Sequence, residues 1–193
     1  MATTANLFLP YDVNVDADDN IYIADSNNYR VRKVLKNGFI MAVAGTGTTG
    51  FSGDGGPATS AQISSPEGIA VSPAGDVYFS HSHRISVVFT NGTITTFSGT
   101  GTSGFNDNTR ADLAILSNPA NMNFGRNNSD LYFSERGTNR VRKISNGFVT
   151  TVAGMGSSSY CGENIDSSLC ALSKPKAAAM DALGNVYVAG MFK

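Results

Sequence analysis

A repeat of 54 to 56 residues runs through this 193-residue chain and constrains its fold more than any other feature. Four segments share an apolar–tyrosine–apolar–small pattern, and their tyrosines are Tyr22, Tyr78, Tyr132 and Tyr187. Prolines keep nearly the same spacing, at Pro10, Pro66, Pro119 and Pro175, and an Asn-Gly pair recurs in phase at 37–38, 91–92 and 146–147. Three series of landmarks in phase indicate an internal repeat of one structural unit.

Each unit is predicted to form four short strands, which in the second unit are 68–71, 77–80, 84–89 and 93–97. Val77 and Phe79 alternate with Tyr78 along the strand, so the first two should lie on one face of the sheet and Tyr78 on the other. Asn-Gly is the preferred pair in a two-residue hairpin turn. A Gly-rich linker with one helical turn, near 111–116, should lead to the next unit. Four-stranded sheets at this period are typical of propeller blades, which stack because one sheet cannot bury both of its faces.

The predicted fold class is therefore all-β, a β-propeller of four-stranded antiparallel blades with about three and a half blades present. The expected boundaries are 7–64, 65–117 and 118–173, followed by a half-blade over 174–193. Six residues before the first strand cannot complete the last blade, so the ring should not close within this chain. Three explanations stay open: a piece of a larger propeller protein, two copies that complete one ring, or an open stack with exposed edges.

Composition excludes some classes of function. The 21 glycines suit many tight turns, and a hydrophobic fraction of 41% is typical of a globular protein. The net charge of −1 lacks the basic excess typical of nucleic-acid binders, so nucleic acid is not expected as a partner. No run approaches the ~20 apolar residues of a membrane helix, so no membrane insertion is expected within this chain. The N-terminus lacks the basic region of a signal peptide.

The repeat resembles the NHL family. The second unit carries the resemblance best, with Pro-Glu-Gly-Ile-Ala-Val at 66–71, Gly-Asp-Val-Tyr-Phe at 75–79 and Arg-Ile at 84–85. The linker over 44–58 is similar to long-loop NHL repeats of the teneurin kind. The resemblance implies a propeller that binds proteins and sometimes RNA, although a few relatives with similar propellers are enzymes. One departure is Gly68, which is replaced by Asp12, Asn121 and Ala177 in the other units.

An Arg-Val-Arg-Lys run recurs in the first and third units. It suggests a basic rim that could bind an acidic peptide or RNA, made of Arg30, Arg32, Lys33, Arg140, Arg142 and Lys143. The alternative is structural: Asp25 could pair with Arg30, and Glu135 with Arg140, across the same hairpins.

Other motifs have simpler interpretations. Gly-x-Gly-x-x-Gly at 45–50 and 99–104 lacks the strand and long helix of a dinucleotide site, so its glycines are expected to form turns. The Asp-rich stretch 16–20 resembles a calcium loop but lacks the required Gly and Glu, so a turn is preferred and no cofactor is expected. His81 and His83 should share one face of an extended segment as surface residues, because a catalytic zinc usually needs three protein ligands.

Two features favour an extracellular or lumenal setting. Cys161 and Cys170 could form a disulfide that closes the last long loop. Asn91 and Asn127 begin glycosylation sequons on predicted turns. The expected function is a non-catalytic module that binds a protein partner through loops on a rigid scaffold. The alternatives are a propeller lyase or hydrolase with a metal site in the central channel, and an RNA-binding surface.

Overall fold

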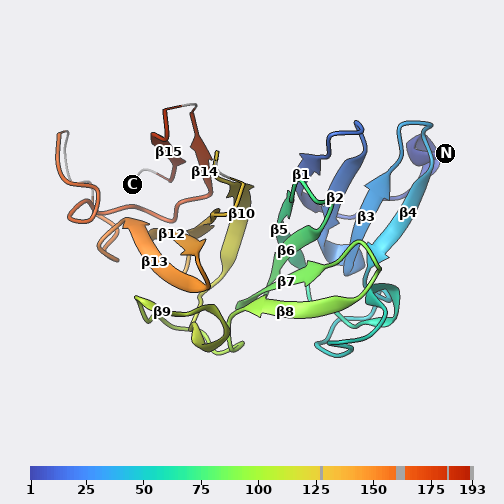
Figure 1. Ribbon diagram of the computed structural model, residues 1–193, viewed down its shortest axis with the longest axis horizontal. Helices are drawn as coiled ribbons and strands as arrows, with labels where there is room; N and C mark the ends of the chain where they lie inside the picture. The colour runs from blue at the N-terminus through green and yellow to red at the C-terminus, as the bar shows by residue number, and fades with distance from the viewer. Residues whose placement is uncertain (127, 160–163, 182, 192–193) are drawn as a thin grey trace.

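The computed structural model describes residues 1–126, 128–159, 164–181 and 183–191. Four antiparallel sheets follow one another along the chain and lie on an arc (Figure 1). Blade 1 comprises β1 Pro10–Val15, β2 Ile21–Asp25, β3 Arg30–Val34 and β4 Ile40–Ala44; blade 2 comprises β5 Pro66–Val71, β6 Val77–His81, β7 Arg84–Val88 and β8 Ile94–Ser98. Blade 3 comprises β10 Pro119–Phe124, β11 Leu131–Glu135, β12 Arg140–Ser145 and β13 Phe148–Ala153, with β9 Thr109–Arg110 at its edge, and blade 4 is described as β14 Ala177–Met180 and β15 Val186–Ala189.

Consecutive blades pack face against face, as the alternation in each strand predicts. Val77 and Phe79 of blade 2 join a buried cluster with Tyr22 and Val31 of blade 1. On the opposite face of blade 2, Tyr78 packs against the cluster that blade 2 shares with blade 3. The period-2 pattern therefore assigns each residue to one interface between blades, and these interfaces are the hydrophobic core.

The inner strand of each blade faces the centre of the arc. Figure 1 shows β1, β5, β10 and β14 gathered there, while β4, β8 and β13 lie at the periphery. The first three inner strands each carry an irregularity in register after their proline or the residue that follows it. This common bulge bends the strand and exposes side chains at the axial end.

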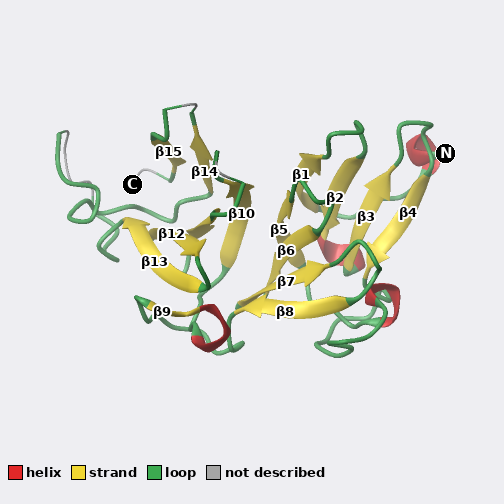
Figure 2. Ribbon diagram, in the orientation of Figure 1, coloured by secondary structure: helices red, strands yellow, loops and turns green. Residues whose placement is uncertain are grey.

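Each linker covers the outer edge of the blade that follows it. Gly55 N–H donates to Ile94 O at 2.8 Å, and β9 pairs with β13. The linkers also contain single turns of 3-10 helix, η3 Ala58–Ser60 and η4 Ala111–Leu113, as expected for the second linker (Figure 2). Two further short turns are η1 Ala2–Thr4 and η2 Ser26–Asn28. An added linker strand pairs groups that an edge strand would otherwise leave exposed.

The Gly-x-Gly motifs are turns, as expected, and the structure shows why glycine is needed. Gly99 has φ +98°, and a Cβ there would lie 2.5 Å from His83 O. Gly101 has φ +86°, and a Cβ there would collide with the Arg84 guanidinium. Positive φ and close approach of neighbouring atoms both require a residue without Cβ. None of the helices in the described part of the chain has the length and hydropathy needed to cross a bilayer.

Candidate functional site at the axial end

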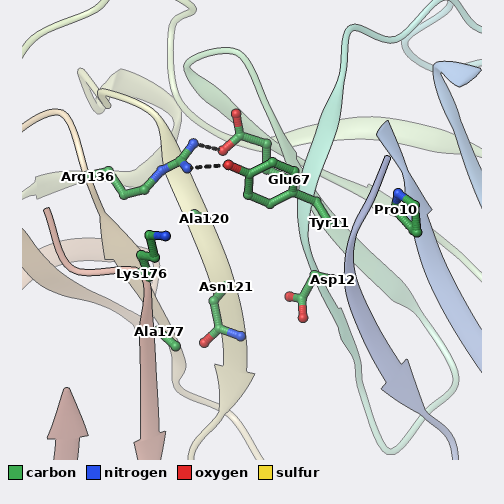
Figure 3. A pocket seen from close by; sticks show the side chains of 9 residues that line it. All are labelled: Pro10, Tyr11, Asp12, Glu67, Ala120, Asn121, Arg136, Lys176 and Ala177. Carbon is green, nitrogen blue, oxygen red and sulfur yellow. Dashed lines mark hydrogen bonds and ion pairs between the residues drawn. The ribbon is translucent and has the colours of Figure 1, made fainter. Parts of the chain in front are cut away.

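A cavity of about 380 Å³ opens at the axial end of the arc, where all four inner strands meet. We call it the axial cavity, and Figure 3 shows its nine lining residues: Pro10, Tyr11, Asp12, Glu67, Ala120, Asn121, Arg136, Lys176 and Ala177. Tyr11, Glu67, Ala120 and Lys176 occupy the same position in their four units, directly after the repeated proline. The repeat therefore brings one variable side chain from each blade to one place.

Arg136 links three blades across this cavity. It follows β11 in blade 3 and donates from Nη1 to the Tyr11 hydroxyl of blade 1 at 2.8 Å. Its Nη2 forms an ion pair with Glu67 of blade 2, as the dashed lines in Figure 3 show. The guanidinium also lies 5.3 Å from the centre of the Tyr11 ring. Charge-assisted hydrogen bonds and the ring contact fix Arg136 in place.

Asp12 and Asn121 join neighbouring inner strands. Asp12 Oδ2 accepts the N–H of Ile69 at 3.1 Å, and Asn121 Oδ1 accepts the N–H of Ala178 at 3.2 Å. Burial raises the pKa of Asp12, while hydrogen bonds from Ile69, from Val13 and from Asn121 act in the opposite direction. The equivalent Gly68 has no room for a side chain, since a Cβ would lie 2.8 Å from the Asn121 nitrogen. Asp12 and Asn121, which replace this glycine in blades 1 and 3, therefore connect neighbouring inner strands.

A second cavity of about 410 Å³ adjoins the first and shares Arg136 and Lys176 with it. We call it the cationic cavity because its lining includes three basic side chains and no carboxylate: Asn118, Arg136, Gly137, Asn139, Lys174, Lys176 and Met191. Lys174 and Lys176 are exposed, and neither forms an ion pair with a described residue. Their ammonium groups give this end of the axis a positive potential that a carboxylate-bearing ligand could neutralise.

The structure does not bring the six predicted rim residues together on one exposed surface. Arg142 is a correction: it is fully buried, with Nη1 3.0 Å from Glu135 Oε2 and Nη2 3.3 Å from Asp107 Oδ1. Arg32 is mostly buried and pairs with Asp25 at 3.3 Å. The structural alternative is thus right in kind, but the arginine that pairs lies two residues beyond the one expected.

Arg30 and Arg140 instead bind the glycine loops. Arg30 Nη2 donates to Thr46 O at 2.6 Å, and Arg140 Nη2 donates to Met155 O at 3.0 Å. Arg84 of blade 2 makes the same contact with Thr100 O at 2.8 Å. These three arginines, at one position of the repeat, hold the Gly-x-Gly turns against the third strands.

Lys33 and Lys143 each lie beside the tyrosine that recurs in every unit of the repeat. Lys33 Nζ is 3.3 Å from Asp16 Oδ2 and 4.7 Å from the centre of the Tyr22 ring. Lys143 Nζ is 3.7 Å from Asp130 Oδ2 and 5.8 Å from the centre of the Tyr132 ring. Whether any of the half-buried rim residues binds a partner stays a prediction.

The stretch 16–20 forms a turn, as preferred from the sequence. Asp16 accepts hydrogen bonds from the N–H and side chain of Asn20 and from the Tyr22 hydroxyl. Burial would raise the pKa of Asp16, but hydrogen bonds from Asn20, Lys33 and Tyr22 lower it well below its usual range. Asp181 makes the same contacts with Asn185 and Tyr187 in blade 4. An Asp-x3-Asn-x-Tyr turn is thus a structural element of the first and fourth units, and calcium binding there stays untested.

The expectation of two surface histidines on one face is wrong. Strand β6 ends at His81, and Ser82 has φ +51°, so the chain turns before His83. His81 is only 2% exposed and lies between Ser64 Oγ, 3.3 Å from Nδ1, and Ser86 Oγ, 2.9 Å from Nε2. Burial, and then the nearby charge of Arg84, lower the pKa of His81 to about 4. His81 is therefore a neutral core residue at pH 7.

The remaining candidates are only partly within the described residues. Cys161 and Asn127 lie outside them, so the disulfide with Cys170 and the second sequon stay predictions. Asn91 is exposed on the β7–β8 turn, where its Oδ1 accepts the N–H of Thr93 at 2.9 Å. No group of three or more His, Cys, Asp or Glu side chains placed to hold a metal ion occurs in the described ranges.

Sequence reasoning missed Arg136, the central residue of the axial cavity. A signal was present, because Ser26 and Ser82 occupy this position in the first two units and only the third unit has a long basic side chain. A position that departs from its own repeat indicates a local role that the scaffold does not require.

Comparison with a family model and with solved structures supports the fold. Residues 46–112 match the family model described as the teneurin NHL domain. A comparison with curated proteins finds no match.

Three solved structures illustrate the likeness. A protein of unknown function from Bacteroides thetaiotaomicron has a TM-score of 0.71 at 19% identity, over 92% of this chain and 44% of that one. Virginiamycin B lyase from Staphylococcus aureus has a TM-score of 0.56 at 19% identity, over 94% of this chain and 48% of that one. A chain of a nidogen–laminin complex has a TM-score of 0.60 at 16% identity, over 92% of this chain and 54% of that one.

The chain thus spans about half the length of each of these three structures. At these identities the likeness establishes the architecture, and fold alone does not fix function. The blades, their register and the solved structures agree that the chain is a run of β-propeller blades, of which residues 46–112 match the teneurin NHL domain.

Proposed function

We propose that the chain is a non-catalytic module that binds an acidic segment of a protein partner at the axial end. The observation that carries this proposal is the cationic cavity, where Lys174 and Lys176 extend beside Arg136 without a carboxylate in the lining. Loops on a rigid scaffold are where binding residues concentrate, and complementary charge speeds encounter with the partner.

The structural use of the other titratable groups supports the same function. His81 is buried between two serines, and Arg142 is paired with Glu135 in the core. Asp12 accepts backbone N–H groups from Val13 and Ile69. These groups stabilise the blades, whereas Lys174 and Lys176 have no such structural partner among the described residues.

Structures similar to this chain include both virginiamycin B lyase and a chain of a nidogen–laminin complex, so their likeness favours neither an enzyme nor a binding protein. The axial end supports binding, because its central guanidinium is already held by Tyr11 and Glu67. A fixed cation beside exposed lysines suits recognition of carboxylates on a flexible peptide.

The test uses a fluorescein-labelled peptide of about ten glutamates. Fluorescence anisotropy should show binding that weakens as salt is added, because exposed charges are screened. The variant Lys174→Ala/Lys176→Ala should bind about tenfold more weakly, at roughly 0.5–1 kcal/mol for each exposed contact. Lys36→Ala is the matched control, since Lys36 is exposed but pairs with Asp19 on another turn.

Equal binding by the double variant and the control would rule out the cationic cavity as the site. Absence of binding to the glutamate peptide, with tight binding of an oligouridine RNA of the same charge, would favour the RNA-binding alternative instead. A serine–glycine peptide of the same length reports non-specific attachment.

A further inference from the structure

The face that blade 2 turns towards blade 1 is apolar and buried. Its residues are Ile69, Val77, Phe79, Val88 and Ile94, each at most 4% exposed. Blade 3 repeats this face towards blade 2 with Met122, Leu131, Phe133, Ile144 and Val149, each at most 2% exposed. The contact between blades is therefore a repeated interface with a fixed set of positions.

Blade 1 carries the same set of positions on the side away from blade 2. We call this the open face, and its residues are Val13, Val15, Ile21, Ile23, Val34 and Ile40. Val13 is 58% exposed and Ile21 is 38% exposed, although their equivalents in blades 2 and 3 are buried. A contiguous apolar face of this kind marks an interaction surface.

The second feature of blade 1 is an arginine without the ring contact that its equivalents in blades 2 and 3 make. Arg84 of blade 2 stacks on Phe51 of the preceding linker at 3.9 Å, and Arg140 of blade 3 stacks on Phe105 at 3.8 Å. Arg30 is the equivalent residue of blade 1, and it stacks on no aromatic ring among the described residues.

A third feature is the edge of blade 1. The N–H of Thr96 in β8 donates to Asp54 of the preceding linker at 3.1 Å, and the N–H of Thr151 in β13 donates to Asp107 at 2.9 Å. Ala42 is the equivalent residue of β4, and no described carboxylate accepts from it. Edge strands that keep free backbone groups are ready to pair with another segment.

We propose that the open face and the β4 edge of blade 1 are a docking surface for one occupant, a complete NHL-type blade followed by its Gly-x-Gly-x-x-Gly-Phe linker. The blade covers Val13 and Ile21 with the face that blade 1 itself presents to blade 2. The phenylalanine of its linker stacks on Arg30, and the aspartate that follows accepts the N–H of Ala42. This occupant extends by one unit the interface that the chain already repeats twice.

A second copy of the chain fits these features less well. Its described last sheet, β14–β15, brings Tyr187, which is 61% exposed, and could cover part of the open face. Two inner strands supply neither a linker phenylalanine for Arg30 nor an acceptor for Ala42. The three features together therefore select a four-stranded blade with its linker.

The register for a test is set by one recurring hydrogen bond. The N–H of Ala58 donates to Gly92 O and that of Ala111 to Gly147 O, and the N–H of Ala2 donates to Gly38 O at 2.7 Å. Ala2 is thus equivalent to Ala111, and a duplicate of residues 65–110 can be joined directly before Ala2 of the full chain. This extension supplies one blade and one linker in phase.

The extended chain should melt about 10 °C or more above the parent, because several large apolar side chains become buried. The amides of Ile40 and Ala42 should exchange with deuterium at least ~10-fold more slowly. Placing Val13→Lys and Ile21→Lys in the extended chain should abolish the gain in Tm, whereas the same changes in the parent should shift its Tm little. Phe105→Ala in the duplicate alone should remove part of the gain.

An extension that leaves the Tm and the exchange of β4 unchanged would overturn the proposal. So would light scattering of the parent chain that shows a dimer in which Val13→Lys breaks the association, because a second copy would then be the occupant. A monomeric parent whose open face binds the dye ANS, with loss of that binding on extension, supports the blade.

Discussion

Arg142 Nη1 lies 3.0 Å from Glu135 Oε2, and both side chains are fully buried between blades 2 and 3. Asp107, from the linker between these blades, approaches Arg142 Nη2 at 3.3 Å, so the guanidinium joins that linker to the sheet. In blade 1 the equivalent pair, Arg32 with Asp25, leaves 18% of the arginine side chain exposed. The two pairs differ in burial, and this difference can be measured.

Arg142→Met should lower the free energy of unfolding by about 3–5 kcal/mol, because it leaves Glu135 buried without its cation. Arg32→Met should cost less, since water reaches that pair. Urea denaturation of both variants measures the difference. Equal losses would show that burial does not set the strength of these pairs.

Gly99→Ala should destabilise the protein more than Gly92→Ala. Both glycines have positive φ, +98° and +83°, so both substitutions carry a similar conformational cost of about 1 kcal/mol. Only at Gly99 would the Cβ also meet a backbone atom, the carbonyl oxygen of His83 at 2.5 Å. We expect a further loss of roughly 1–3 kcal/mol in thermal or urea unfolding. Similar losses at the two positions would contradict the steric role of the loop.

His81 should make stability depend on pH between about 6.5 and 4. Burial lowers its pKa from 6.5 to about 4, so in this range the unfolded chain binds a proton that the folded chain does not. Stability therefore rises with pH through this window and is lost as pH falls, by on the order of 3 kcal/mol over the whole range. Chemical denaturation at a series of pH values measures the slope.

The matched variants are His81→Gln and His83→Gln. The first should flatten the slope between pH 6.5 and 4, because it removes the buried imidazole. The second should keep the slope of the parent, since His83 is half-buried outside the core. A parent slope that survives in His81→Gln would assign the pH dependence to another group.

Asp54→Ala should loosen the β8 edge without unfolding the blade. Asp54 Oδ2 accepts the N–H of Thr96, so its removal should speed deuterium exchange at Thr96 and at Ile94 beside it. The global free energy of unfolding should fall by only about 1 kcal/mol, the net value of one hydrogen bond. Asp19→Ala, which removes a carboxylate from an exposed turn, is the control and should leave exchange at Thr96 unchanged.

The repeat predicted the blades well because backbone pattern and burial act locally. The expected strand 77–80 is observed as Val77–His81, and the expected strand 93–97 as Ile94–Ser98. Alternation assigned Phe79 and Tyr78 to opposite faces, as observed. These features follow from the two-residue alternation of side chains along a strand, which can be read from a single sequence.

The errors arise where side chains choose among several partners in three dimensions. Glu135 is directly opposite Arg140 in the ladder, yet it pairs with Arg142, because the glycine loop provides a carbonyl for Arg140. Alternation predicts that His81 and His83 share one face, but a positive φ at Ser82 ends the strand before His83.

The axial cavity was outside what the sequence could predict. It depends on Arg136, which reaches Tyr11, 125 residues away in the chain. A contact over this separation follows from how the blades are arranged around the axis, and the repeat fixes only the order of the blades along the chain.

The order in which linkers and blades occur has a consequence for synthesis on the ribosome. The segment that shields the outer strand of blade 2 precedes that blade in the chain, and β9 likewise precedes β13. During translation from the N-terminus, the shield of each of these strands emerges before the strand itself. A nascent blade can therefore cap its last strand as soon as that strand leaves the exit tunnel, which limits the time available for aggregation between neighbouring nascent chains.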